Sequence, residues 1–313
     1  MTADELAPFA AILTDPPTRE LTEETLRWVR AHNVFEGTRL QGSARLVVVA
    51  SVYAKLCSPP FATARQHRVA ALFTLLFFYI DDAPAEELPS LLSGTEPWTV
   101  GRLTPCMRAF LDEFREMTTC TEELRESLSR SYHGYLRARA EELHNKARPL
   151  SVDEHWAFRQ KTIFMDPYID HWMILLQLDT TTFSVASFAA ARTLATDIVL
   201  LSNDLGSVER DRPDGASPDD LNLVDAFVRE RGWSRVEAIE RLIERHNQMV
   251  QDVRAALRAC ADASGTESAR SYAALLASIV DGNLGSLRAL KFRYTGIAAT
   301  LRRLEEVSWA HIQ

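Results

Sequence analysis

The chain lacks the features that mark several protein classes. It holds only 12 glycines in 313 residues, and alternating runs of Val, Ile and Thr are few, which argues against a protein built on β-sheet. Its apolar runs are too short to cross a membrane or carry charges, as with Lys55 and Asp197. The first residues carry acidic side chains and no basic stretch, so we expect neither a signal peptide nor a membrane partner.

Cysteine and positive charge are scarce as well. The four cysteines (Cys57, Cys106, Cys120 and Cys260) lie apart, without the paired spacing of a metal site. This pattern favours free thiols in a reducing cytoplasm over a disulfide framework, and we expect a cytoplasmic protein. Lys and Arg number 35 against 43 Asp and Glu, a formal net charge of −8. Nucleic-acid-binding proteins carry a basic surface, so we expect no nucleic-acid partner.

Helix-forming residues dominate what is present. Ala, Leu, Arg and Glu are abundant, and a hydrophobic content of 46% is enough for a large core. No internal repeat and no long linker is found, so residues 1–313 are predicted to form one all-α domain, an antiparallel helical bundle, with residues 1–19 as a loosely attached N-terminal segment. The periodicity predicts helices over residues 20–32, 41–57, 61–82, 104–117, 121–145, 152–177, 179–210, 219–230, 234–262 and 267–293, with a last one to about residue 310.

The segment from Asn203 to Asp211 is the most informative for chemistry. It follows an apolar run, residues 189–201, that is typical of a helix. In a helix, Asn203, Ser207 and Asp211 are spaced four residues apart and share one face. An amide, a hydroxyl and a carboxylate form an all-oxygen set that suits Mg²⁺. Arg210 is placed to meet an anion beside the metal, which indicates a phosphorylated substrate.

A second acidic cluster ends an apolar, aromatic helix. Asp81 and Asp82 close this helix, and Glu86 follows four residues later. Carboxylates at a helix C-terminus oppose the helix dipole, and burying them is costly unless a cation meets them. Taken alone, the cluster is equally consistent with acids on the protein surface. Together with the Asn203 segment, it indicates a multi-metal clamp for a diphosphate.

Three more residues are candidates to hold such an anion. Arg159 lies in a helix among aromatic residues, after a capping box formed by Ser151 and Glu154, and Arg293-Tyr294 ends a long helix. Arginine suits phosphate because its planar guanidinium directs several donors at once. Each of these residues alone is more often a surface ion-pair residue. Their order around the acidic motifs favours a diphosphate site.

Together these residues resemble the class I terpene synthases (terpene cyclases) of bacterial type. That family has an aspartate-rich motif, a later N-D-x-x-S-x-x-x-E motif, a sensor arginine some forty-odd residues before the second motif, and an arginine–tyrosine pair near the C-terminus. The order and spacing fit from about residue 45 to the end of this chain. The matching residues are Asp81-Asp82-x-x-x-Glu86, Arg159, Asn203-Asp204-x-x-Ser207-x-x-Arg210-Asp211 and Arg293-Tyr294.

The chain departs from the family pattern at both motifs. Asp211 stands where the family usually has Glu, so this carboxylate is one methylene shorter, and Arg210 stands where Lys is common. The aspartate-rich motif is a DDxxxE variant. Asp82, Glu86 and Glu87 therefore remain alternative partners for the first aspartate.

The resemblance implies a fold, a cofactor and a set of site residues. The fold would be the all-α isoprenoid synthase bundle with a central apolar cavity. Three Mg²⁺ ions would bind between the two motifs, with ligands from Asp81, Asp82, Glu86, Asn203, Ser207 and Asp211. The substrate diphosphate would be bound by Arg159, Arg210, Arg293 and Tyr294. Catalysis would depend on Asp81, Arg159, Arg293 and Tyr294, and Phe77 and Phe78 would line the cavity.

The implied reaction is ionisation of a linear isoprenyl diphosphate, farnesyl or geranylgeranyl diphosphate, and cyclisation of the carbocation to a terpene hydrocarbon or alcohol. One alternative is a class I diterpene synthase acting on a pre-cyclised diterpene diphosphate, and a more distant one is a non-catalytic helical scaffold. A chain-elongating prenyltransferase is disfavoured, because it would need two similar aspartate-rich motifs. Homodimers are common for this fold, and the sequence leaves monomer and homodimer open.

Overall fold

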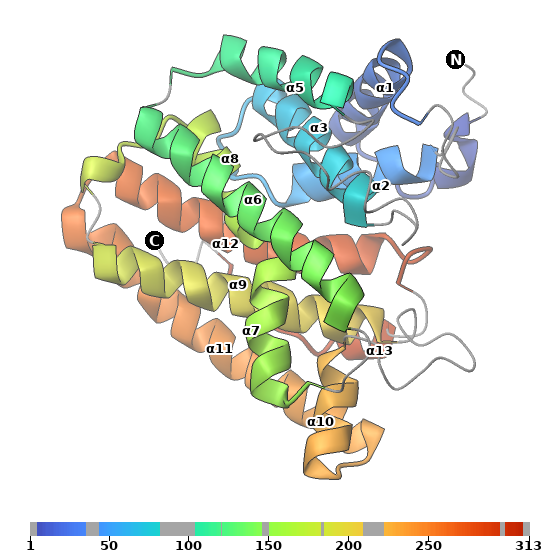
Figure 1. The fold of residues 1–313 in the computed structure, drawn as a ribbon, viewed down its shortest axis with the longest axis vertical. Coiled ribbons are helices and arrows are strands. Elements are labelled where there is room, and N and C mark those ends of the chain that lie inside the picture. Colours follow the sequence, from blue (N-terminus) through green and yellow to red (C-terminus); the bar gives the residue numbers. More distant parts are fainter. Residues whose placement is uncertain are drawn as a thin grey trace.

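The protein is helical throughout the part of the chain that the structure describes (Figure 1). The structure, a computed structural model, describes residues 5–35, 44–81, 104–119, 121–145, 150–182, 185–208, 222–294 and 298–308. Within these ranges there is no β-strand, and the predicted all-α fold is confirmed. The same residues include no helix long and apolar enough to cross a membrane.

The helices follow one another along the chain in two groups. The first group comprises η2 (Ala7–Phe9), α1 (Pro16–Ala31), α2 (Ala44–Leu56), α3 (Ala64–Asp81), α5 (Thr104–Met117), α6 (Glu122–Asn145) and α7 (Val152–Thr162). The second group comprises α8 (Met165–Leu175), η4 (Thr180–Thr182), α9 (Val185–Ser207), α10 (Leu223–Arg231), α11 (Arg235–Ser264), α12 (Glu267–Ala289) and α13 (Ala298–Leu301).

The predicted helix over residues 152–177 is wrong, because the structure breaks it into α7 and α8. Ile163 N–H closes α7 on the carbonyl of Arg159, and Phe164 then takes a left-handed conformation with φ of 64°. The physical reason lies at Pro167, the third residue of α8. Proline lacks the N–H that would bond to the carbonyl of Ile163, and its ring would clash with that carbonyl in a continuous helix. The capping box of Ser151 and Glu154 at the start of α7 is confirmed.

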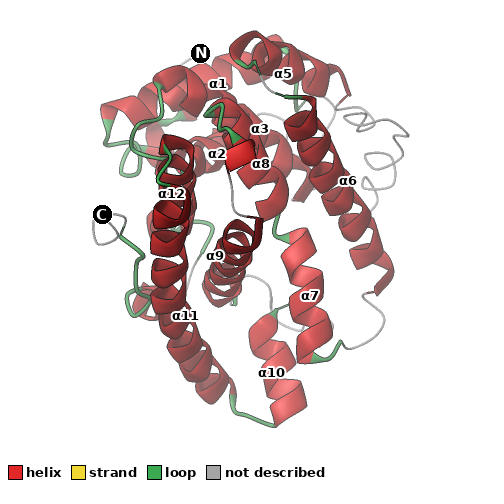
Figure 2. Ribbon diagram, turned by 90° about the vertical axis from the view of Figure 1, so that its left-hand side faces the viewer, coloured by secondary structure: helices red, strands yellow, loops and turns green. Residues whose placement is uncertain are grey.

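Helix α9 lies in the interior of the molecule. It packs against α11 and α12 and also contacts α7, so that Figure 2 shows it between these helices. Ile198, Leu200 and Leu201 have no exposed surface. Burial on several faces explains why this stretch is a continuous apolar run rather than an amphipathic one. The polar residues at its C-terminal end are therefore held by a rigid element.

One glycine permits the close packing of α12 on α2. A Cβ atom at Gly282 would lie 2.2 Å from the backbone oxygen of Leu56. No side chain fits that space, so the two helices meet at this position only because residue 282 is glycine. The contact fixes the helix that leads to Arg293.

Both ends of the described chain pack onto the bundle. Leu13 is buried, and Asp15 caps α1 by accepting a hydrogen bond from the amide of Thr18. At the other end, helix is confined to Ala298–Leu301, shorter than predicted. The following residues lie along α11 and α12, where Asp281 accepts hydrogen bonds from the amides of Val307 and Ser308.

Candidate functional site

The second motif lies at the C-terminal end of α9. Asn203 is half-buried, and Ser207, one turn later on the same helix, is fully buried. Their spacing of four residues in an α-helix gives them a common face, as the sequence predicts. Arg210 and Asp211 lie outside the described residues.

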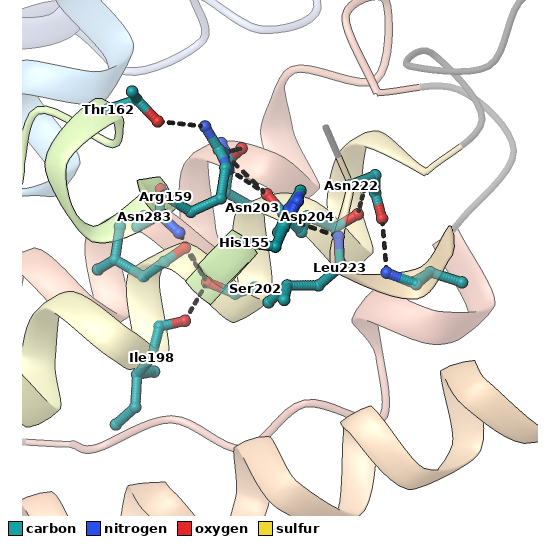
Figure 3. Close-up of polar contacts among 12 residues, drawn as sticks. His155, Arg159, Thr162, Ile198, Ser202, Asn203, Asp204, Asn222, Leu223 and Asn283 are labelled. Carbon is teal, nitrogen blue, oxygen red and sulfur yellow. Dashed lines mark hydrogen bonds and ion pairs between the residues drawn. The ribbon is translucent and has the colours of Figure 1, made fainter. Parts of the chain in front are cut away.

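Arg159 of α7 reaches this end of α9. Its Nη2 donates to Oδ1 of Asp204 at 2.8 Å and lies 3.4 Å from Oδ1 of Asn203, and its Nε donates to the same Asp204 oxygen at 3.2 Å. On the other side, Nη1 donates to the hydroxyl of Thr162 at 3.2 Å (Figure 3). The side chain is only 13% exposed. The guanidinium is thus held in one orientation beside the proposed metal ligand Asn203.

Asp204 is a residue of this site to which the sequence analysis assigns no role. It is 1% exposed, and its Oδ2 lies 3.7 Å from Nε2 of the buried His155. Burial alone would raise the pKa of Asp204, but the charge of Arg159 and the contact with His155 outweigh it and hold this pKa below its usual value. The signal in the sequence is its position in the motif, directly after the proposed metal ligand Asn203.

Asp204 also fixes the start of α10. Its Oδ2 accepts a hydrogen bond from the backbone amide of Leu223 at 3.0 Å, and its backbone oxygen accepts one from the side chain of Asn222 at 2.9 Å. Asn222 in turn caps α10, since its Oδ1 accepts from the amide of Val224 at 2.9 Å (Figure 3). The end of α9 and the beginning of α10 are therefore joined through a single buried carboxylate.

The first motif begins at the end of α3, where Asp81 is the last residue of the described range 44–81. Arg139 of α6 donates from Nη2 to the backbone oxygen of Asp81 at 2.8 Å, and its Nε lies 3.8 Å from Oδ1 of the same residue. Sequence reasoning missed Arg139, because nothing in its local pattern distinguishes it from other arginines of α6. Asp82, Glu86 and Glu87 lie outside the described residues.

The arginine–tyrosine pair follows α12 and is buried. Arg293 is 9% exposed and Tyr294 is 7% exposed. Their amides both bond to the carbonyl of Leu290, so the chain turns tightly after the helix. The guanidinium carbon of Arg293 lies 5.1 Å from the centre of the Phe78 ring. This cation–π contact brings the pair to the helix that ends in Asp81.

Phe77 belongs to an aromatic cluster between α3, α6 and the α7–α8 break. Its ring stacks on that of Phe164 at 4.1 Å and meets the edge of Tyr135 at 5.6 Å. Its neighbour Phe78 meets the edge of Tyr53 at 5.8 Å. Phe77 and Tyr53 are half-buried rather than fully buried. Phe164 follows the helix of Arg159, so the cluster extends from the end of α3 to the α7–α8 break.

The donor set fits a hard divalent cation. Asn203 and Ser207 offer amide and hydroxyl oxygens on one helix face, and Asp81 offers a carboxylate, which are the ligand types that Mg²⁺ prefers. Among the described residues no group of three or more His, Cys, Asp and Glu side chains forms a metal site. The other proposed carboxylate ligands, Asp82, Glu86 and Asp211, lie outside the described ranges.

Residues 72–252 match the protein family described as "Terpene synthase family 2, C-terminal metal binding". The matched stretch is more than half of the 313 residues. The chain belongs to the terpene synthase family. The match contains Asp81, Arg159 and the Asn203 motif, and the description of the family indicates that this region binds a divalent metal.

Solved terpene synthases have the same fold. The 2-methylisoborneol synthase of Streptomyces coelicolor A3(2) is 16% identical, with a TM-score of 0.74 over 90% of this chain and 92% of that one. The linalool/nerolidol synthase of Streptomyces clavuligerus, solved with 2-fluorogeranyl diphosphate, is 22% identical, with a TM-score of 0.68 over 90% of this chain and 96% of that one. The germacradien-4-ol synthase of Streptomyces citricolor is 21% identical, with a TM-score of 0.67 over 87% and 96%.

A fungal protein is also similar. A protein of Coprinopsis cinerea named "Linoleate 10R-lipoxygenase COP4" is 24% identical over an alignment of 250 residues, and the match covers 72% of this chain and 68% of that protein. Its name refers to a reaction of a fatty acid. The structural neighbours above are named for terpene products instead.

Proposed function

We propose that this terpene synthase is a Mg²⁺-dependent cyclase of a linear isoprenyl diphosphate, farnesyl or geranylgeranyl diphosphate. The observation that carries the proposal is the cluster of Arg159, Asn203 and Asp204. In this cluster an arginine, which suits phosphate, lies beside the amide oxygen of Asn203, which suits Mg²⁺, and both residues lie in the region matched by the metal-binding family. A diphosphate can bind to the arginine and to the metal at the same time. The product would be a terpene hydrocarbon or alcohol, released together with diphosphate.

Each basic residue would act on the diphosphate oxygens. Arg159 and Arg293 are largely buried, so their hydrogen bonds to an anion form where water competes weakly. Arg210 and Tyr294 would add further donors. Asp81, Asp82, Glu86, Asn203, Ser207 and Asp211 would hold Mg²⁺, with three ions as the expected number. When bound, the ions would neutralise the diphosphate and make it a better leaving group.

The aromatic residues would act on the hydrocarbon part of the substrate. Phe77 and Phe78 lie four and three residues before Asp81 on α3, close to the proposed diphosphate site. Their rings would exclude water from the carbocation and stabilise it by cation–π attraction. The resulting apolar surface would fold the chain for ring closure.

Product analysis tests this proposal. The protein is incubated with Mg²⁺ and, separately, geranyl, farnesyl or geranylgeranyl diphosphate, and the extracted products are identified by mass spectrometry. We expect a cyclic terpene and an equal amount of diphosphate from the farnesyl or geranylgeranyl substrate. The absence of Mg²⁺-dependent diphosphate release from all three would contradict the proposal.

Two further reactions in the same experiment cover the alternatives. A bicyclic diterpene diphosphate as substrate tests the class I diterpene synthase reaction, in which only pre-cyclised material is consumed. Linoleate with oxygen tests the reaction in the name of the fungal relative. If the protein converts the bicyclic diphosphate or linoleate and none of the linear diphosphates, the proposed substrate is wrong and the converted compound takes its place.

A further inference from the structure

We infer that Asp204 is a positioning residue for the diphosphate reaction, which it serves by holding Arg159 in place. This inference rests on the proposed function, because it assigns Arg159 to the substrate diphosphate. Asp204 itself is buried and bonded on both oxygens, so it is not assigned a contact with the substrate.

The ion pair of Asp204 and Arg159 has a geometry that orients the guanidinium. Oδ1 of Asp204 accepts hydrogen bonds from both Nε and Nη2 of Arg159, at 3.2 and 2.8 Å. Two donors along one edge of a planar guanidinium fix the orientation of its plane as well as its position. An arginine side chain that moves freely loses rotamer entropy when it binds an anion. Asp204 orders this side chain before any anion arrives.

Asp204 is itself attached to the start of α10. Its other oxygen accepts the backbone amide of Leu223 at 3.0 Å, and its backbone oxygen accepts the Asn222 side chain at 2.9 Å. Arg159 is thus fixed relative to α9, which carries Asn203, and to α10. A carboxylate that is carried by one buried helix and bonded to the first amide of the next is a rigid support for an arginine.

A second carboxylate of the same helix, that of Asp197, can be compared with Asp204. Asp197, two turns earlier on α9, accepts hydrogen bonds from Trp156 at 2.8 Å and Gln160 at 2.7 Å. Both of these donors belong to α7, the helix that carries Arg159. Asp197 therefore contributes to the attachment of α7 on α9 through the side chains of Trp156 and Gln160. It provides a matched control that separates attachment of the helix from positioning of the arginine.

Calorimetric titration with inorganic diphosphate in saturating Mg²⁺ tests the inference on the full chain. We expect Asp204→Asn to weaken diphosphate binding about tenfold or more, since Asp204 uses both carboxylate oxygens, and Asn, which has one acceptor oxygen and no charge, leaves either Arg159 or the Leu223 amide without its partner. Asp197→Asn should bind within about twofold of the wild type, because Asn still offers an acceptor oxygen. In steady-state kinetics, Asp204→Asn should raise KM and lower kcat, and Asp197→Asn should change neither.

A double-mutant cycle shows whether Asp204 acts through Arg159. In an Arg159→Gln background, Asp204→Asn should have little further effect on diphosphate affinity. The double variant also leaves no unpaired buried charge, so it remains measurable if Asp204→Asn alone folds poorly. As a metal-free readout, hydrogen exchange at the Leu223 amide should be faster in Asp204→Asn and unchanged in Asp197→Asn.

Three results would overturn the inference. They are wild-type or tighter diphosphate affinity in Asp204→Asn, equal losses in both single aspartate variants, and fully additive losses in the cycle. A wild-type protein that binds no diphosphate with Mg²⁺ would instead overturn the proposed function, and the inference with it.

Discussion

The ring of Phe164 stacks on the ring of Phe77 with centroids 4.1 Å apart and planes within 8° of parallel. Phe164 is the residue at the break between α7 and α8, and Phe77 lies one turn before Asp81. The stack therefore joins the helix of the first motif to the end of the Arg159 helix, and the Phe77 ring belongs to the surface proposed to meet the carbocation.

Phe77→Leu is expected to change the product mixture more than the rate of ionisation. An aromatic ring near a cation contributes about 0.5–2 kcal/mol, and a difference of 1.4 kcal/mol between competing barriers changes a product ratio about tenfold. Product ratios from mass spectrometry check this. Phe114→Leu serves as a control, since its ring stacks on Phe110 and His171 instead. Identical products from Phe77→Leu and the wild type would remove Phe77 from the proposed cavity.

Arg139→Gln is expected to reduce kcat/KM about tenfold or more. The variant removes the donor to the backbone oxygen of Asp81 and a positive charge beside its carboxylate, and hydrogen bonds of charged groups contribute about 1.5–3 kcal/mol. The control is Arg130→Gln on the same helix, where an exposed pair with Glu126 contributes little. Equal kcat/KM values in the two variants would show that Arg139 does not support the first motif.

Sequence patterns predict most of the fold and miss particular contacts, for identifiable reasons. Apolar periodicity is strong enough to predict the helices, including the α9 helix that carries Asn203. Apolar periodicity does not predict the break at Phe164, because the residues on both sides have a helical pattern. Pro167 is the sequence feature that indicates it. The pairs Arg159–Asp204 and Arg139–Asp81 join residues 45 and 58 positions apart. No local spacing shows such partners.

Gly282→Ala is expected to destabilise the protein, because the new methyl group would lie 2.2 Å from the backbone oxygen of Leu56. Overpacking of this kind costs about 1–3 kcal/mol, and a backbone atom yields less readily than a side chain. Gly285→Ala is the matched control in the same helix, since its methyl group would lie 3.6 Å from Leu56 Cδ1, an ordinary contact. Urea denaturation compares the two. Equal stability would contradict the close packing of α12 on α2.

His171 is expected to make stability depend on pH. Burial between the rings of Phe73 and Phe114 lowers its pKa from 6.5 to about 3. The folded protein therefore holds His171 neutral at pH values where the unfolded chain binds a proton. This contribution is fully present above about pH 6.5 and decreases as the pH falls toward 3, by at most about 1.4 kcal/mol per pH unit.

His171→Phe isolates this effect while keeping the stacked ring. Urea denaturation at pH 7 and pH 5 should show a smaller loss of unfolding free energy in the variant than in the wild type. The same pH dependence in both proteins would show that His171 is not held neutral in the folded state.

Asn203→Ala tests the central claim most directly, through Mg²⁺-dependent release of diphosphate from farnesyl or geranylgeranyl diphosphate. The wild type should release diphosphate only with Mg²⁺, and the variant should release none above background, with an unchanged circular dichroism spectrum. The half-buried amide of Asn203 has an oxygen to offer a metal, and alanine offers no ligand. Wild-type release of diphosphate by Asn203→Ala would show that α9 does not carry the metal site.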